Sequence, residues 1–162
     1  MNDPETRARI RAFLREHTTL ALATVDAQGA SAVAAVFYAV DDDLNLYFLS
    51  EERTEHGRNM LAHPQVAGAI HEDGQDWRAI RGLQLKGRSE IARGRVLAEA
   101  MFLYAARFAF VAPLLAGQAG PAALTGPLAR ARFWVLRPSW LRLVDNTVKF
   151  GHKEELILPE AA

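Results

Sequence analysis

Residues 20–50, LALATVDAQGASAVAAVFYAVDDDLNLYFLS, contain three apolar runs separated by two short polar turns. The runs cover residues 20–25, 30–40 and 44–50, and β-branched and aromatic residues are frequent in them. In the last run, Leu44, Leu46 and Phe48 occupy every second position. The turns, residues 26–29 and 41–43, are rich in aspartate. Strands joined by turns this short pair as antiparallel neighbours. The stretch therefore predicts a three-stranded antiparallel meander.

A helix is expected before the meander. Asp3 is a suitable N-cap, Pro4 suits the first helical position, and Ile10, Phe13 and Leu14 then fall on one face. After the meander, Thr54 caps a short helix over residues 54–62. The remaining expected elements are strands 65–71 and 77–92, an apolar helix from 96 towards 117, a loose segment 117–127, and strands 132–144 and 154–158.

The order of these elements determines the expected fold class. The strands cluster instead of alternating with crossover helices, which argues against a doubly wound parallel sheet. We therefore expect a mostly β (α+β) protein, a closed antiparallel barrel with peripheral helices. Repeats and linkers are absent, and 162 residues fit a single domain spanning 1–162.

Composition excludes several classes of function. The chain has 19 basic and 19 acidic residues, so no global field favours nucleic acid or an anionic membrane. It has no cysteine, which excludes disulfides, thiol nucleophiles and thiolate metal sites. Glu99, Arg107 and Pro113 interrupt the apolar segment 96–117, so we expect a buried or interfacial helix and no membrane span. The charged first residues lack an apolar export signal, and we expect a cytoplasmic protein.

Familiar catalytic motifs are also missing. The sequence contains no G-x-S-x-G, no P-loop and no G-x-G-x-x-G after a strand. The five histidines are scattered, without the H-x-x-x-H spacing of many zinc sites. We therefore expect no metal and identify no catalytic residue.

The junction between residues 50 and 56 is the most informative polar feature. A strand ends at Ser50, and a helix begins after Thr54. A helix N-terminus offers free N–H groups and a partial positive charge. The hydroxyls of Ser50 and Thr54, with Arg53 and His56 as cations, would complete a phosphate pocket. The alternative is a capped helix after an ordinary polar loop.

Aromatic residues in the strands permit two interpretations as well. They are Phe37, Tyr38, Tyr47, Phe48, Trp134 and Trp140. A flavin ring needs an apolar slot with a few polar edges. Aromatic residues in strands also serve as core residues or cross-strand pairs.

Four segments, in this order and spacing, carry a resemblance to a known family. They are residues 20–50, 54–67, 77–87 and 136–153. Together the sequence resembles the pyridoxamine 5′-phosphate oxidase-like, FMN-binding split β-barrel superfamily, and within it a small bacterial subgroup. The resemblance extends from about Thr18 to Leu158. It implies an antiparallel split β-barrel that forms a homodimer, with two FMN sites at the subunit interface.

The resemblance also implies which residues bind the flavin. The phosphate pocket would be built from the ends of two strands and the junction that follows. The 80s strand and the C-terminal strand would reach across from the partner, with Gln84 and Trp140 at the ring. With Arg53 from the junction, the expected cofactor-binding residues are Val36, Phe37, Tyr38, Leu49, Ser50, Arg53, Thr54, His56, Gln84 and Trp140.

The sequence departs from the family pattern in three places. Glu55 stands where the family has Arg or Lys, Val33 stands where it often has Arg, and the C-terminal Arg-x-His substrate motif is missing. The missing motif argues against pyridoxamine phosphate as substrate. A carboxylate repels a phosphate, so we expect Glu55 to face the pocket and weaken it; the alternative is that it points to solvent.

The function that follows is an FMN-dependent oxidoreductase acting on an unidentified small molecule, in which the flavin carries the chemistry. The alternative is a non-catalytic split-barrel protein that binds haem or a deazaflavin, or that stores or senses flavin. In a haem protein, His56, His71 or His152 would serve as the axial ligand.

Overall fold

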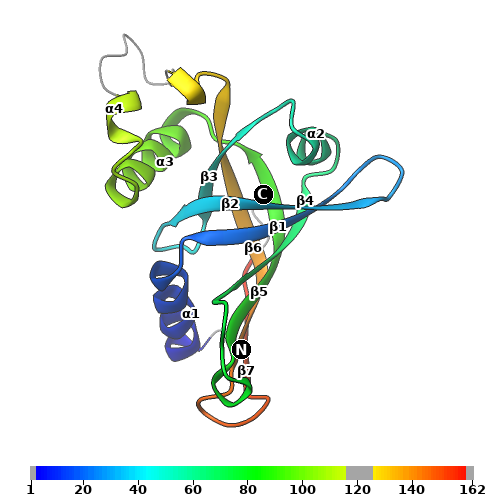
Figure 1. Ribbon diagram of the computed structural model, residues 1–162, viewed down its shortest axis with the longest axis vertical. Coiled ribbons are helices and arrows are strands. Elements are labelled where there is room, and N and C mark those ends of the chain that lie inside the picture. The colour runs from blue at the N-terminus through cyan, green and yellow to red at the C-terminus, as the bar shows by residue number, and fades with distance from the viewer. Residues whose placement is uncertain (1–2, 116–125, 160–162) are drawn as a thin grey trace.

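The computed structural model describes residues 3–115 and 126–159 of the chain. Seven antiparallel strands form one sheet in the order β3-β2-β1-β4-β5-β6-β7, and β3 also pairs with β6 (Figure 1). This last pairing closes six strands into a barrel and leaves β7 outside the ring. The strands are β1 Thr19–Val25, β2 Ser31–Val40, β3 Leu46–Glu51, β4 Gln65–His71, β5 Arg81–Ile91, β6 Ala131–Asp145 and β7 Lys153–Ile157.

The long strand β6 is responsible for the closure. One edge of β6 pairs with β5 over almost the whole strand. The other edge pairs first with β3, from Ala131 to Leu136, and then with β7, from Trp140 to Val144. The fold prediction is therefore confirmed: the chain is an antiparallel barrel with helices at its periphery.

Side chains of alternate strand residues fill the barrel. Leu22 lies opposite Gly68, Gly68 opposite Leu85, and Leu85 opposite Leu141, so one register row crosses the interior. Because strand side chains alternate between the two faces, the next row points outward. Tyr38, Phe48 and Trp134 are fully buried in this core, so for these residues the interpretation as core is correct.

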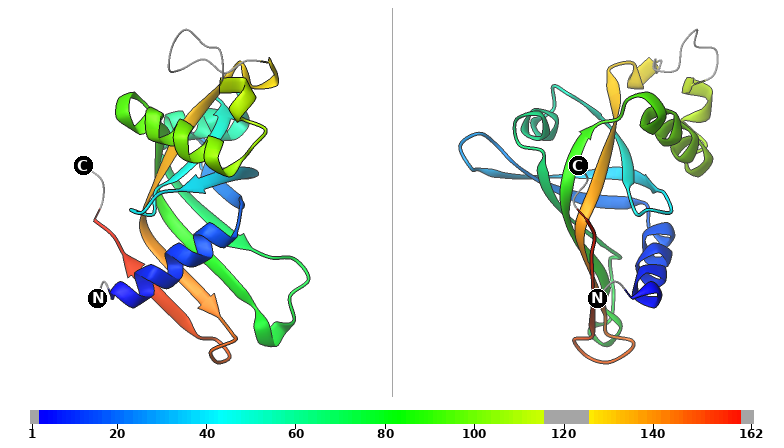
Figure 2. Two further views of the ribbon diagram at one scale, coloured as in Figure 1. Left: turned by 90° about the vertical axis from the view of Figure 1, so that its left-hand side faces the viewer. Right: turned by 180° about the vertical axis from the view of Figure 1, so that it is seen from behind.

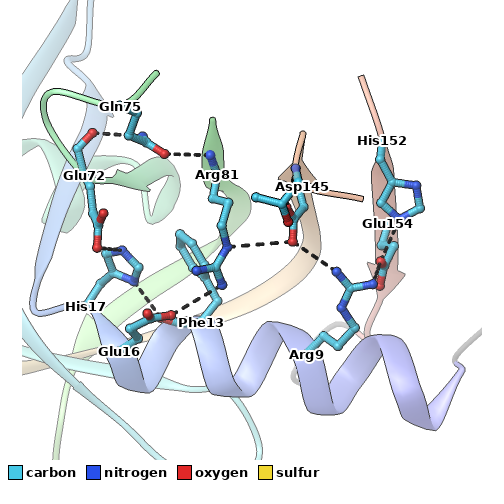
Figure 3. Close-up of polar contacts among 11 residues, drawn as sticks. Arg9, Phe13, Glu16, His17, Glu72, Gln75, Arg81, Asp145, His152 and Glu154 are labelled. Carbon is cyan, nitrogen blue, oxygen red and sulfur yellow. Dashed lines mark hydrogen bonds and ion pairs between the residues drawn. The ribbon is translucent and has the colours of Figure 1, made fainter. Parts of the chain in front are cut away.

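The first helix, α1 (Pro4–Glu16), covers one side of the barrel (Figure 2). Asp3 caps it, and Ile10, Phe13 and Leu14 are buried against the core, as predicted. A polar network joins α1 to strands β5, β6 and β7 (Figure 3). In this network the Asp145 carboxylate accepts a hydrogen bond from Arg9 at 3.1 Å and lies 3.7 Å from the Arg81 guanidinium. Arg9 also forms an ion pair with Glu154, and Arg81 forms one with Glu16.

A second helical layer covers the outside of β2, β3 and β6. Helix α3 (Gly94–Arg107) places Ala100 and Tyr104 against Tyr47, Phe133 and Val135. The apolar helix expected over 96–117 ends earlier, at Arg107. The Arg107 guanidinium donates to the carbonyls of Arg15 and His17, and the extended backbone of Phe108 ends the helix. A short helix, α4 (Ala112–Leu115), follows.

Most of the predicted loose segment 117–127 lies outside the described residues, which resume with the 3₁₀ turn η2 (Gly126–Leu128). No helix among the described residues is long and apolar enough to cross a membrane.

Two further boundaries differ from the prediction. The strand expected to begin at residue 77 begins at Arg81, because Asp76 caps a 3₁₀ turn, η1 (Trp77–Ala79). The strand expected from Leu44 begins at Leu46, because Leu44 has a φ of 72° in the turn after β2. The short helix α2 (Glu55–Ala62) is capped by Thr54 as expected.

Candidate functional site

A pocket opens where β2 and β3 separate. The two strands pair only from Tyr38 to Val40, opposite Leu46 to Phe48. Beyond that point β3 continues along β6, and the first half of β2 stays with β1. The space between them has a volume of about 350 Å³. Its lining residues come from β2, β3, α2 and its N-cap, α3 and the segment after it, η2 and the start of β6: Ala35, Val36, Phe37, Leu49, Ser50, Glu51, Thr54, His56, Tyr104, Phe110, Leu128 and Ala131.

One wall of this pocket is polar. The Ser50 hydroxyl oxygen lies 2.5 Å from His56 Nε2 and 3.3 Å from Thr54 Oγ1. Thr54 acts as the N-cap of α2: its hydroxyl accepts from the Gly57 N–H at 3.0 Å and donates to the Glu51 carbonyl at 2.8 Å. The cap fixes the direction in which α2 begins, and so brings His56 back over the end of β3.

The charge in this wall is smaller than the sequence suggested. Burial lowers the pKa of His56, and the neighbouring Glu55 opposes that effect only in part, so the imidazole is neutral at pH 7. Arg53 is exposed, pairs with Glu51 and does not line the pocket. Arg132 pairs with Glu52 at 3.3 Å. The lining therefore offers hydrogen-bonding groups but no arginine or lysine.

Glu55 does not face the pocket. Its side chain is exposed, and it is not one of the lining residues. This arrangement matches the alternative in which Glu55 points to solvent. The physical reason is its place in the first helical turn: the cap directs His56 and Gly57 inward, and Glu55 falls on the opposite side.

The opposite wall is apolar and aromatic. Phe37, Tyr104, Phe110 and Leu128 contribute to it. The Tyr104 hydroxyl donates to the Phe37 carbonyl at 3.3 Å, which ties α3 to the free edge of β2. Burial raises the pKa of Tyr104 to about 12, so Tyr104 remains a neutral donor. Together the two walls offer an apolar slot with a polar end.

Six of the ten residues expected to bind the cofactor line this pocket: Val36, Phe37, Leu49, Ser50, Thr54 and His56. Tyr38 does not, because it points into the barrel, where its hydroxyl donates to the Leu14 carbonyl at 2.8 Å. Gln84 and Trp140 lie on β5 and β6, outside the lining. Their expected role was to reach a partner's flavin, and within one chain that stays a prediction.

Residues that sequence reasoning missed lie mainly in α3 and after it. Tyr104 and Phe110 are about fifty residues from the junction in the chain. The apolar character of segment 96–117 predicted only a buried or interfacial helix. No spacing in the sequence links that helix to β2, so local patterns could not have found these residues.

The chemistry of the pocket fits a flavin better than a metal. The hydroxyls and the α2 N-terminus suit a phosphate, and the aromatic wall suits an apolar ring. Among residues 3–115 and 126–159, no three His, Asp or Glu side chains are grouped to hold a metal ion. His56 is the histidine of this lining, and Ser50 occupies its Nε2.

Comparison with known proteins gives the family. A UPF0306 protein of Klebsiella pneumoniae is 33% identical over 124 residues, which cover 74% of this chain and 72% of that protein. Among solved structures, a haem-binding protein of Mycobacterium smegmatis matches with a TM-score of 0.75 at 21% identity. The match covers 97% of this chain but only 60% of the mycobacterial one. HutZ, the haem storage protein of Vibrio cholerae, matches with a TM-score of 0.65 at 19% identity, over 97% and 95% of the two chains.

At these identities the solved structures support the fold alone. The family model for pyridoxamine 5′-phosphate oxidase matches residues 6–145, which include all six strands of the closed barrel and the pocket between β2 and β3. The chain therefore belongs to the pyridoxamine 5′-phosphate oxidase family.

Proposed function

We propose that the protein binds FMN as a homodimer and works as a flavin-dependent oxidoreductase on a small molecule. One observation carries the proposal: the capped N-terminus of α2, with two hydroxyls and an imidazole, faces the same pocket as an aromatic wall. The polar end suits the phosphate of FMN, and the aromatic wall suits the ring or the ribityl chain.

The residues of the chain would bind and orient the cofactor. The N–H groups at the start of α2 carry the partial positive charge of a helix N-terminus. If His56 carries its proton on Nε2 and donates to Ser50 Oγ, the Ser50 hydroxyl proton points to Thr54 Oγ1 and would turn to a phosphate oxygen when one is bound. Bound FMN would supply the hydride or electron transfer.

Exposed apolar side chains support the dimer. Val33 and Phe37 lie on the outward face of β2, and Phe102 and Phe110 lie on or after α3; between half and three quarters of each residue is exposed. Exposed apolar patches of this kind mark interaction surfaces. Phe37 and Phe110 also line the pocket, so a partner covering this surface would help to enclose the cofactor.

The experiment compares FMN with riboflavin, which differ only in the phosphate. We expect the purified protein to bind FMN about tenfold more tightly, because one charge-assisted hydrogen bond contributes about 1.5–3 kcal/mol. Ser50→Ala and Thr54→Ala should reduce FMN affinity to the riboflavin level. Thr19→Ala, which removes an exposed hydroxyl outside the pocket, is the control. Equal affinities for both flavins in the unmodified protein would refute the phosphate site.

Haem binding is the second candidate, because two proteins of the same fold are named for it. An axial ligand would come from a histidine outside the occupied Ser50–His56 pair. His71 is exposed, whereas His152 Nε2 lies 2.8 Å from Glu154 Oε1 and would have to leave that carboxylate to bind iron. A Soret band that appears with added haemin and disappears in His71→Ala or His152→Ala would support this function. Flavin bands without a Soret shift would support the first.

A further inference from the structure

A second and larger hollow lies on the outer face of the sheet, away from the pocket between β2 and β3. Its volume is about 520 Å³, within the range of about 300–1,000 Å³ typical of small-molecule sites. It shares no lining residue with the first pocket. We call it the outer groove, and its lining residues are Ala23, Thr24, Val25, Ser31, Gln65, Val66, Ala67, Lys86, Gly87, Arg88, Arg137 and Ser139.

The outer groove exists because two strands separate here as well. β1 pairs with β4 only from Ala21 to Ala23. Beyond Ala23 the hairpin of β1 and β2 leaves the barrel and projects into solvent (Figure 1). On this face Ala23 lies opposite Ala67, and Ala67 lies opposite Lys86, so two small side chains form a floor beside the lysine.

A β-bulge completes the far wall. Lys86 lies opposite Trp140 and Gly87 opposite Pro138, so Ser139 is an extra residue in β6. Bulges re-aim side chains and are frequent beside functional sites. The close approach requires glycine, since a Cβ on Gly87 would lie 2.8 Å from the Pro138 Cα and nearer still to the Arg137 carbonyl.

The groove is strongly cationic for a chain with no net charge. Its lining contains Lys86, Arg88 and Arg137 but no carboxylate. Arg137 has Glu90 as an ion-pair partner, and the Lys86 ammonium lies over the face of the Trp140 ring, 5.2 Å from the ring centroid. Arg88 makes no side-chain hydrogen bond or ion pair with any described residue. An unpaired arginine above an apolar floor complements an anion that carries an apolar body.

We infer that the outer groove binds a planar organic anion, with a carboxylate or phosphate on an apolar ring. The ring would lie on Ala23 and Ala67, and the anionic group would meet Arg88, with Lys86 and the Ser139 hydroxyl close to it. The outer groove shares no lining residue with the pocket between β2 and β3, so the two sites can be tested separately, although Lys86 lies over Trp140, which is expected to reach a partner's flavin.

The first test is a titration of the full-length protein with 2-naphthoate, followed by fluorescence and by amide shifts in NMR spectra. We expect saturable binding, with the largest shifts at Ala67, Gly87 and Arg88. Neutral 2-naphthol should bind at least tenfold more weakly, since a charge-assisted hydrogen bond is worth about ten- to a hundredfold in affinity. 2-Naphthyl phosphate binding more tightly than 2-naphthoate identifies phosphate as the preferred group; the reverse order identifies carboxylate.

The matched variants are Arg88→Gln and Arg95→Gln. Arg95 is an exposed arginine at the start of α3, outside the groove. Arg88→Gln should weaken 2-naphthoate binding at least tenfold, and Arg95→Gln should leave it unchanged. Equal binding by both variants, or shifts confined to the pocket around Ser50, would overturn the inference.

A third variant, Ala67→Leu, tests the floor without altering charge. It should abolish 2-naphthoate binding while the thermal unfolding midpoint and the sedimentation mass stay unchanged. If Ala67→Leu changes the sedimentation mass and the unmodified protein does not bind 2-naphthoate, a second copy of the chain covers the groove and the small-molecule inference is wrong.

Discussion

Substituting Gly57 by alanine should loosen the junction that forms the polar end of the β2–β3 pocket. Gly57 is the third residue of α2, and its N–H donates to the capping hydroxyl of Thr54 at 3.0 Å. An added Cβ would lie 2.8 Å from the Glu52 carbonyl oxygen, 2.9 Å from Thr54 Oγ1, and closer still to the Glu51 carbonyl oxygen. Backbone atoms cannot rotate aside, so the loop and the start of α2 must move apart.

The sign of the effect decides between two physical arguments. Helix propensity alone predicts that Gly→Ala stabilises the protein by about 1 kcal/mol. Overpacking a closed site costs about 1–3 kcal/mol, and disturbing an N-cap costs about 1 kcal/mol more. We therefore expect a net destabilisation of about 1–3 kcal/mol. At a typical slope of about 2 kcal/mol/M this lowers the urea midpoint by about 0.5–1.5 M.

Urea unfolding followed by circular dichroism measures the change, with Gly82→Ala as the control. A Cβ on Gly82 would meet Ile70 O at 3.6 Å, an ordinary contact, so this control should be neutral or slightly stabilising. In Gly57→Ala, FMN affinity should also fall, while riboflavin affinity changes less. A Gly57→Ala protein as stable as the unmodified one would refute the described packing of the junction.

Three further predictions concern charged groups. Replacing Asp145 by alanine should lower the free energy of unfolding by about 1.5–3 kcal/mol at pH 7, because this carboxylate is only 7% exposed and interacts with Thr147, Arg9 and Arg81. The control, Asp42→Ala, should lower it by less than about 1 kcal/mol, because the Asp42 carboxylate is 78% exposed. Burial acts to raise the pKa of Asp145, but hydrogen bonds from Thr147 and the charges of the two arginines lower this pKa overall. The Asp145 carboxylate therefore stabilises the fold above the unfolded-state pKa of about 3.9, and this stabilisation should be lost as the pH falls through the lower pKa of the folded state. Urea unfolding at a series of pH values measures the loss. Glu55→Arg should change FMN affinity by less than about threefold, because Glu55 is exposed and outside the pocket, where solvent screens its charge. A flavin fluorescence titration measures the affinity, and a gain of about tenfold or more would show that Glu55 acts on the phosphate.

Sequence reasoning located part of the pocket lining, and the helix cap explains why one neighbouring residue lies outside it. Ser50, Thr54 and His56 were found because a strand end, an N-cap and the residue behind it are close in sequence. Arg53 was assigned to the same site by proximity alone. It turns outward to Glu51 because the helix cap determines which side chains point inward.

The sequence by itself determined the type and order of the strands and the two capped helices. Alternation over four to ten residues, turn residues and N-caps are local signals, and each describes its own element without reference to the rest. Antiparallel pairing of β1, β2 and β3 followed from turns of only a few residues. The resemblance to a known family extended these local signals to a split barrel.

Only the tertiary structure decided where the strands part. The closing pair, β3 with β6, joins residues 80 to 90 positions apart, and it separates β3 from the first half of β2. The same closure brings Tyr104 and Phe110 to the pocket and leaves Tyr38 inside the barrel. The outer groove likewise depends on β1 leaving β4 and on a bulge between β5 and β6. These features result from competition among strands for edges and for buried volume, which depends on the whole barrel and is not encoded in any single segment.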